Sequence, residues 1–201
     1  MTAHVLGISG SPRLGGNTDW IVQESLSAAS ENGATVKLLR ICDYDLRPCD
    51  ACLACQSTGR CAIADDIDKL YQAITDADGV ILGSPVYFQG VTAQMKTFID
   101  RVGYLHNARG RKDFEGKVGG VIAVARRSGF EAACSQMLMF LTAARMVIPS
   151  GGRVFAVARE KGEVAQDEEG VDSARYLGRM IVRTIEASQV LRAPIEASKK
   201  P

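Results

Sequence analysis

Short apolar segments of strand length alternate along the chain with longer segments whose apolar residues recur at helical spacing. The strand-like segments occupy residues 4–9, 35–40, 79–83, 118–125 and 153–158. Continuous apolar strands separated by helices are typical of a parallel sheet that is covered on both faces. The pattern therefore predicts an α/β fold with five parallel strands.

Apolar residues at helical spacing fill several of the intervals between these strands. In chain order they are Val22, Leu26 and Ala29, then Val91, Met95, Phe98, Ile99 and Val102, and finally Leu177, Ile181 and Ile185. Five strands with intervening helices fit a flavodoxin-like doubly wound sheet with strand order 2-1-3-4-5. We expect a single domain over residues 1–192, since one core can serve up to roughly 250 residues, and a flexible tail at 193–201.

Two stretches interrupt the alternation of strands and helices. Residues 41–64 are too long and too rich in Cys for an ordinary connection, and long loops inside compact domains are usually functional. Residues 159–170 form a run of charged side chains, for which a solvated loop is the simplest expectation.

The composition is that of a soluble globular protein, with 46% hydrophobic residues and 24 basic residues against 23 acidic ones. A nucleic-acid partner is not expected, because a phosphate-binding face normally requires an excess of Lys and Arg. The start of the chain lacks the features of a signal peptide, and no apolar run approaches the roughly 20 residues that span a bilayer. We therefore expect a cytoplasmic protein with no membrane partner. In the reducing cytoplasm, clustered cysteines are more typical of a metal or redox site than of disulfides.

The loop after the first strand, residues 9–18, is rich in hydroxyl and amide groups and leads into a helix. Such a loop offers backbone N–H groups and the positive end of the helix dipole to an anion. The G-x-G-x-x-G fingerprint is absent, and Gly15 is followed by Gly-Asn where a P-loop needs Lys and Ser or Thr. With Arg13 as its one cation, the loop suits a terminal monophosphate such as that of FMN. The alternative is a plain strand-to-helix turn with Asn17 or Thr18 as the N-cap.

Two further loops follow the third and fourth strands, at the carboxyl end of the sheet where ligands of open α/β folds bind. Residues 83–90 read Gly-Ser-Pro-Val-Tyr-Phe-Gln-Gly, and their aromatic pair can pack against a flat ring system. Residues 126–129, Arg-Arg-Ser-Gly, approach the same crevice. The sequence contains no recognisable pair of nucleophile and base, so we assign no catalytic side chain.

These loops resemble those of the NADPH-dependent FMN reductase group within the flavodoxin-like superfamily. The resemblance rests on Gly-Ser-Pro-Arg at 10–13 with Asn-Thr at 17–18, on residues 83–88, and on Lys-x-x-x-Asp-Arg at 96–101, and it covers about residues 4–158. It implies that the first loop holds the FMN phosphate and that the second lines the isoalloxazine. The predicted cofactor-binding residues are Ser9, Ser11, Pro12, Arg13, Asn17, Thr18, Ser84, Pro85, Val86, Tyr87, Phe88, Arg126 and Ser128.

Four cysteines, Cys49, Cys52, Cys55 and Cys61, follow the spacing C-x2-C-x2-C-x5-C. Closely spaced thiolates suit an iron-sulfur cube, which needs four converging soft ligands. Zinc sites usually divide into two C-x2-C pairs that are a dozen or more residues apart. The spacing is similar to that of the iron-sulfur flavoproteins, a branch of the same group, and this resemblance implies a [4Fe–4S] cluster beside FMN in an oligomer. Free or zinc-bound thiols are the alternatives.

The remaining polar residues have simpler interpretations. Cys42 and Cys134 are expected to be small buried side chains. Asp100 and Arg101 are expected to form an ion pair at a helix end, as an alternative to a catalytic role.

Together these features predict an FMN-dependent electron-transfer oxidoreductase in which a cluster couples one-electron and two-electron steps. A cluster-free NAD(P)H-dependent FMN or quinone reductase and a non-enzymatic flavodoxin-like electron carrier are the two alternatives. NAD(P)H is a candidate donor, and the acceptor is a redox partner protein or a small molecule. We expect a homodimer or homotetramer, in which the Cys loop of one subunit meets the flavin of another.

Overall fold

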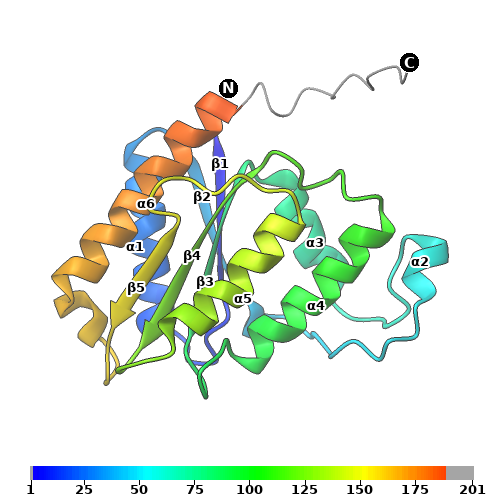
Figure 1. Cartoon of the computed structure of the whole chain (residues 1–201), viewed down its shortest axis with the longest axis horizontal. Coiled ribbons are helices and arrows are strands. Elements are labelled where there is room, and N and C mark those ends of the chain that lie inside the picture. The colour runs from blue at the N-terminus through cyan, green and yellow to red at the C-terminus, as the bar shows by residue number, and fades with distance from the viewer. Residues whose placement is uncertain (1, 189–201) are drawn as a thin grey trace.

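A computed structural model describes residues 2–188 of the chain. Its centre is a five-stranded parallel sheet with the order β2-β1-β3-β4-β5 (Figure 1). The predicted doubly wound order is therefore confirmed, whereas the expected tail at 193–201 lies outside the described residues. The strands are β1 (His4–Ser9), β2 (Thr35–Arg40), β3 (Gly79–Pro85), β4 (Val118–Ala125) and β5 (Arg153–Val157).

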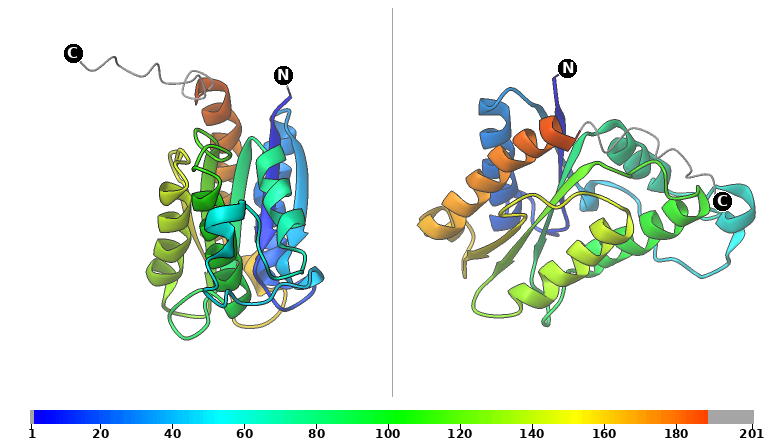
Figure 2. Two further views of the ribbon diagram at one scale, coloured as in Figure 1. Left: turned by 90° about the vertical axis from the view of Figure 1, so that its right-hand side faces the viewer. Right: turned by 45° about the horizontal axis from the view of Figure 1, so that its top comes forward.

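Helices cover both faces of the sheet (Figures 1 and 2). One face carries α1 (Asn17–Glu31) and α6 (Glu168–Ala187). The other face carries α3 (Ile67–Asp76), α4 (Ala93–Ala108) and α5 (Phe130–Ala143). Three short elements complete the described chain: η1 (Ile41–Asp43), α2 (Ala54–Thr58) and η2 (Glu163–Gln166). No helix within residues 2–188 is both long enough and apolar enough to cross a membrane.

Each face of the sheet has its own hydrophobic layer. Val80 and Leu82 of β3 belong to the layer that includes Phe98 of α4. Ile81, between them, belongs to the opposite layer together with Val22 of α1. Because successive side chains of a strand point to opposite faces, a strand buried on both sides needs an apolar residue at every position. This requirement explains the continuous apolar runs in the sequence.

The strand limits predicted from the sequence agree closely with the structure. Strands β1, β2 and β4 have the predicted limits, β3 continues for two residues to Pro85, and β5 ends at Val157. The expectation of a simple solvated loop at 159–170 is wrong, because this stretch contains η2 and the first turn of α6. Val164 is fully buried, and Asp167 caps α6 by accepting a hydrogen bond from the backbone N–H of Gly170 at 3.2 Å.

Helices α1 and α6 approach so closely that Gly178 has no room for a side chain. A Cβ atom at this position would lie 2.0 Å from the carbonyl oxygen of Ser25 and 3.1 Å from Cβ of Ala28. The closest obstacle is backbone, which cannot move aside as a flexible side chain would. The glycine therefore sets the distance between the two helices.

We expect Gly178→Ala to lower the free energy of unfolding by about 1–3 kcal/mol, the usual cost of overpacking. In an unobstructed helix the same change would raise stability by up to about 1 kcal/mol. Gly103→Ala in α4 is the matched control, since a Cβ there would meet Phe140 at an ordinary 3.8 Å. Urea denaturation of both variants checks the prediction, and a Gly178→Ala protein as stable as the wild type would contradict it.

Candidate functional site

The loop between β1 and α1 is organised around one buried carboxylate, Asp19. Its Oδ1 accepts a hydrogen bond from the hydroxyl of Ser9, and its Oδ2 accepts one from the backbone N–H of Gly15 at 2.9 Å. Arg40 of β2 forms an ion pair with the same Oδ2 at 2.9 Å. The charge of Asp19 is therefore compensated beside a loop predicted to receive an anion. Sequence reasoning missed Asp19, although an acid at the third position of a helix often bonds back to the preceding loop.

The first turn of α1 leaves its backbone N–H groups available. The N-cap is Gly16, which provides no side chain to cap the helix, so the alternative that Asn17 or Thr18 is the N-cap is wrong. Ser11 stabilises the preceding turn, since its hydroxyl oxygen accepts a hydrogen bond from the backbone N–H of Arg13 at 3.2 Å. Free N–H groups at a helix start are well suited to bind an anion.

Asn17 connects this loop to the segment after β5. Its Nδ2 donates to the carbonyl of Glu160 at 2.8 Å, and its Oδ1 accepts from the backbone N–H of Gly162 at 2.7 Å. Lys161 adds a third link by donating to the carbonyl of Leu14 at 3.0 Å. The segment that was expected to be a solvated loop thus supports the predicted phosphate loop.

The loop after β3 makes a tight turn at Tyr87–Gly90. The backbone N–H of Tyr87 donates to the carbonyl of Gly90 at 2.9 Å, and the reverse bond measures 3.1 Å. Phe88 and Gln89 both have positive φ, at 46° and 68°, a conformation that costs non-glycine residues about 1 kcal/mol or more. The turn leaves the Phe88 side chain fully exposed, with a relative accessibility of 107%.

A buried hydroxyl network joins the first two loops. Thr92 is the N-cap of α4, where its hydroxyl oxygen accepts from the backbone N–H of Met95 at 3.1 Å and its O–H donates to the carbonyl of Gly10 at 2.7 Å. The hydroxyl of Ser84 accepts from the backbone N–H of Thr92 at 3.1 Å. Ser84 is fully buried, so it supports the loops from within. Sequence reasoning did not identify Thr92, which lies two residues beyond the loop it considered.

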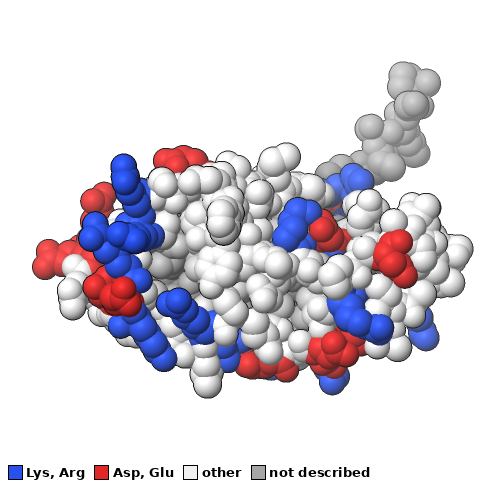
Figure 3. Space-filling model, turned by 90° about the horizontal axis from the view of Figure 1, so that it is seen from below, with Lys and Arg blue, Asp and Glu red and all other residues white. Residues whose placement is uncertain are grey.

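Residues from all three predicted loops meet in one pocket at the carboxyl edge of the sheet. Three of its lining residues are arginines and none is acidic, and Lys and Arg side chains gather on one side of this face (Figure 3). Ala158 and Arg159, after β5, line it as well and were not predicted. The predicted residues that line the pocket are Ser11, Arg13, Asn17, Thr18, Pro85, Val86, Tyr87 and Arg126. The predicted residues that do not line it are Ser9, Pro12, Ser84, Phe88 and Ser128.

The four clustered cysteines line a second pocket, which lies against α4. They share it with Arg101, Tyr104 and Leu105 of that helix and with neighbouring residues of their own segment. All four thiols are free; Cys49 and Cys52 are exposed, and Cys55 and Cys61 are half-buried. Ala51 and Leu53, on either side of Cys52, have φ of 58° and 59°. These two left-handed residues bend the backbone sharply around the pocket.

A buried ion pair fixes the carboxyl end of the cysteine segment, residues 41–64. Arg101 and Asp65 have side-chain exposures of 1% and 0% and join through contacts of 2.8 and 2.9 Å. Asp65 also accepts hydrogen bonds from the backbone N–H groups of Arg47 and Ile67. Burial alone would raise the pKa of Asp65, but the hydrogen bonds from Arg101 and from the two N–H groups outweigh it and lower the pKa. The carboxylate is therefore ionised and paired.

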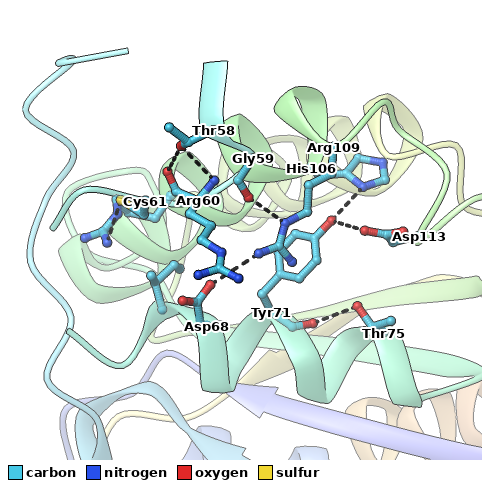
Figure 4. A network of polar contacts seen from close by, with 12 residues as sticks. Thr58, Gly59, Arg60, Cys61, Asp68, Tyr71, Thr75, His106, Arg109 and Asp113 are labelled. Carbon is cyan, nitrogen blue, oxygen red and sulfur yellow. Dashed lines mark hydrogen bonds and ion pairs between the residues drawn. The ribbon is translucent and has the colours of Figure 1, made fainter. Parts of the chain in front are cut away.

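Arg109, at the end of α4, holds the same segment at a second point (Figure 4). Its Nε donates to the carbonyl of Gly59 at 2.9 Å, and its guanidinium lies 4.3 Å from the ring centroid of Tyr71 and pairs with Asp68. The Tyr71 hydroxyl donates to Asp113 at 2.7 Å. Burial and this hydrogen bond raise the pKa of Tyr71, so the phenol stays protonated.

Two expectations about single residues need correction. Asp100 and Arg101 do not pair with each other: Asp100 pairs with Lys96 at 2.6 Å, and Arg101 pairs with Asp65. Cys42 is exposed, because it lies in η1 at the surface, whereas Cys134 is buried as predicted. Burial raises the pKa of Cys134 to about 12, which keeps it a neutral thiol.

The four thiols of the second pocket are the kind of soft ligands that an iron-sulfur cube takes. Within residues 2–188, no three His, Cys, Asp or Glu side chains lie close enough together to hold one metal ion. Four thiols nevertheless surround one pocket, and a cube takes one thiolate at each of its four irons. A buried cation, Arg101, also lines this pocket, as suits a group that carries negative charge.

Comparison with known proteins identifies the family of the chain. The model of the family described as NADPH-dependent FMN reductase matches residues 3–160. An iron-sulfur flavoprotein of Methanocaldococcus jannaschii is 37% identical over 189 residues, which cover 90% of this chain and 96% of that protein.

Solved structures support the fold. RosB, in a crystal structure with bound 8-demethyl-8-formylriboflavin-5'-phosphate, superposes with a TM-score of 0.78 at 14% identity, over 95% of this chain and 82% of RosB. A flavodoxin from the domain Archaea superposes with a TM-score of 0.61 at 12% identity, over 91% of this chain and 99% of the flavodoxin. The fold is therefore flavodoxin-like, as the sequence predicted. Because the family model matches well over half of the chain, the chain belongs to the NADPH-dependent FMN reductase family.

Proposed function

We propose that this protein is an FMN-dependent electron-transfer oxidoreductase that carries a [4Fe–4S] cluster on Cys49, Cys52, Cys55 and Cys61. The observation that carries the proposal is the presence of two different pockets in one chain. One is formed mainly by the predicted phosphate loop, residues 9–18, and by the aromatic loop, residues 83–90. The other is surrounded by four free thiols. FMN would accept electrons singly or in pairs while the cluster passes them one at a time, so the two together would couple donors and acceptors of different kinds.

The support for FMN comes from the charges and surfaces of the first pocket. Arg13, Arg126 and Arg159 line it without an acidic neighbour in the lining, so they would compensate the roughly two negative charges of a terminal phosphate. Val86 and Tyr87 form an apolar wall in the same pocket, which would pack against a flat ring and exclude water. The role of these side chains is binding and orientation, since none of them forms a pair of acid and base.

Two other functions use the same flavin pocket. A cluster-free NAD(P)H-dependent FMN or quinone reductase would need only the first pocket, and family membership supports a reductase of this kind. A flavodoxin-like carrier would exchange electrons with protein partners only. Stopped-flow mixing with NADH or NADPH separates an NAD(P)H-dependent enzyme from a carrier, because only the enzyme bleaches its flavin directly.

The location of the two pockets supports a shared site between subunits. They have no lining residue in common, and α2 lies beyond α4, away from the loops after β1 and β3 (Figure 1). The N-cap Thr92 bonds to the loop after β1, whereas Arg101, Tyr104 and Leu105 of the same helix line the cysteine pocket. These residues lie nine to thirteen positions beyond Thr92, which is about 14–20 Å along the helix at 1.5 Å per residue. We infer that the working unit is a homo-oligomer in which the cluster of one subunit serves the flavin of another.

Arg13→Gln should weaken FMN binding about tenfold or more, because a hydrogen bond to a charged group contributes about 1.5–3 kcal/mol. Riboflavin lacks the phosphate, so its affinity should be unchanged. Arg127→Gln is the control, since it removes the same charge from an exposed residue outside the pocket lining. Fluorescence titration of the flavin-free protein checks the prediction, and an equal loss for FMN and riboflavin would contradict a phosphate contact.

Anaerobic reconstitution should give about four irons and four sulfides per chain. Cys52→Ala should abolish the cluster, because the cube then lacks one of its four ligands. Cys42→Ala should retain it, since Cys42 is exposed and does not line the pocket. Iron and sulfide analysis with an absorption spectrum gives the result, and a wild type without iron would leave the cluster-free reductase as the function.

Light scattering should find a dimer or tetramer. The groove between α4 and α5 contains the exposed side chains of Tyr104 and Met139, so we expect Met139→Glu to weaken the assembly by placing a charge on an apolar contact. Glu131→Gln, on the same helix outside this groove, is the control. A wild-type monomer with full flavin content and activity would exclude the shared site.

A further inference from the structure

Arg101 combines deep burial with direct contact to one of the four clustered thiols. Its Nη2 donates to Sγ of Cys61 at 3.2 Å. The same guanidinium pairs with Asp65 through both terminal nitrogens, and its Nη1 donates to the carbonyl of Arg47 as well. A buried cation is costly unless its partners are well placed, so these contacts fix the guanidinium at the sulfur.

The contacts of Arg101 exceed what attachment of the segment requires. Arg109 already holds this segment from the same helix, through the carbonyl of Gly59, and has no sulfur contact in the described structure. Nε of Arg101 is buried and has no hydrogen-bond partner among residues 2–188. An unsatisfied buried donor of this kind destabilises the folded state. The chain therefore keeps a buried guanidinium next to Cys61, with one N–H group unsatisfied, in addition to a second anchor.

A donor at a ligand sulfur changes the energies of the two oxidation states unequally. Reduction of a thiolate-bound cluster adds one negative charge, which a nearby N–H group and positive charge stabilise. Asp65 offsets part of this charge, but the guanidinium is the group that contacts the sulfur. Arginine remains protonated throughout, so one electron enters from the reductant and no proton moves at Arg101.

We propose that Arg101 is a positioning residue of the cluster site, which fixes Cys61 and makes the reduction potential of the cluster more positive through its N–H to the sulfur. This inference rests on the proposed [4Fe–4S] cluster. It assigns to Arg101 a role that neither an ion pair at a helix end nor attachment of the loop would give it.

The test compares three variants of the full chain after anaerobic reconstitution with iron and sulfide. Asp65→Asn/Arg101→Met removes both buried charges together, which keeps the net charge of the site unchanged and leaves an amide to accept the backbone N–H bonds. Arg101→Lys retains the positive charge without the fork that reaches both Asp65 and Cys61. Arg109→Met is the matched control, because it loses an anchor of the segment but no sulfur contact.

The readout is the midpoint potential of the cluster, measured by electron paramagnetic resonance during titration with dithionite and redox mediators. We expect the double variant to lower the equilibrium constant for reduction about tenfold, a shift of about 59 mV to more negative potential for one electron. Arg101→Lys should shift in the same direction by less, and Arg109→Met should keep the wild-type potential. Loss of the cluster from a folded double variant, with retention in Arg109→Met, would also support the positioning of Cys61.

A wild-type potential in either Arg101 variant, once folded and loaded with about four irons, would overturn the inference while leaving the proposed function intact. An equal shift in Arg109→Met would overturn it as well, because attachment of the segment would then explain the effect. Failure of the wild type to bind iron is a different result, since it rejects the cluster itself. Circular dichroism and thermal unfolding establish which variants are folded.

Discussion

All five strands run in the same direction, and both faces of their sheet are buried under helices. Every loop that follows a strand therefore emerges at the same edge, where residues distant in sequence meet. The packing of α1 shows how tightly this is enforced, because a Cβ on Gly83 would lie 2.3 Å from Val22 and one on Gly7 would lie 2.7 Å from the same side chain. The two glycines let α1 lie directly on β1 and β3, which brings its first turn beside the loops.

Polar contacts within this edge convert neighbouring loops into one defined pocket. The Asp19–Arg40 pair supports the loop after β1, and Thr92 connects that loop to the start of α4. Asn17 connects it to the segment after β5. Each such bond contributes only about 1 kcal/mol net, but a buried group left without its partner costs more. These contacts hold the loops in one arrangement, and pre-organisation of this kind reduces the entropy lost on binding.

The cysteine segment depends on a different principle, because it lies outside the sheet and has little hydrophobic core of its own. Helix α4 supplies the support through Arg101 and Arg109, which are eight residues apart and so lie near one face of the helix. One guanidinium contacts a sulfur, and the other holds the backbone beside α2. Helix α4 thus begins beside the loops of the first pocket and supports the thiols along its second half. It is the element that connects the two proposed redox sites.

The sequence by itself determined the sheet, because burial on both faces leaves a continuous apolar signal. It also singled out the loop after β1 and the four cysteines, which the structure places in two separate pockets. It did not single out α5, whose apolar residues occur on nearly every side, and it could not assign a partner to Arg101. Eight of the predicted cofactor residues reach the pocket, whereas Ser9 and Ser84 turn inward to support it. Only the tertiary structure decided between these roles, since the direction of a polar side chain depends on partners such as Asp19, Thr92 and Asp65 that are distant along the chain or outside any motif. The apolar pattern along the chain shows which residues are buried. It does not show which polar side chains meet, because those contacts form only when distant parts of the chain come together in the fold.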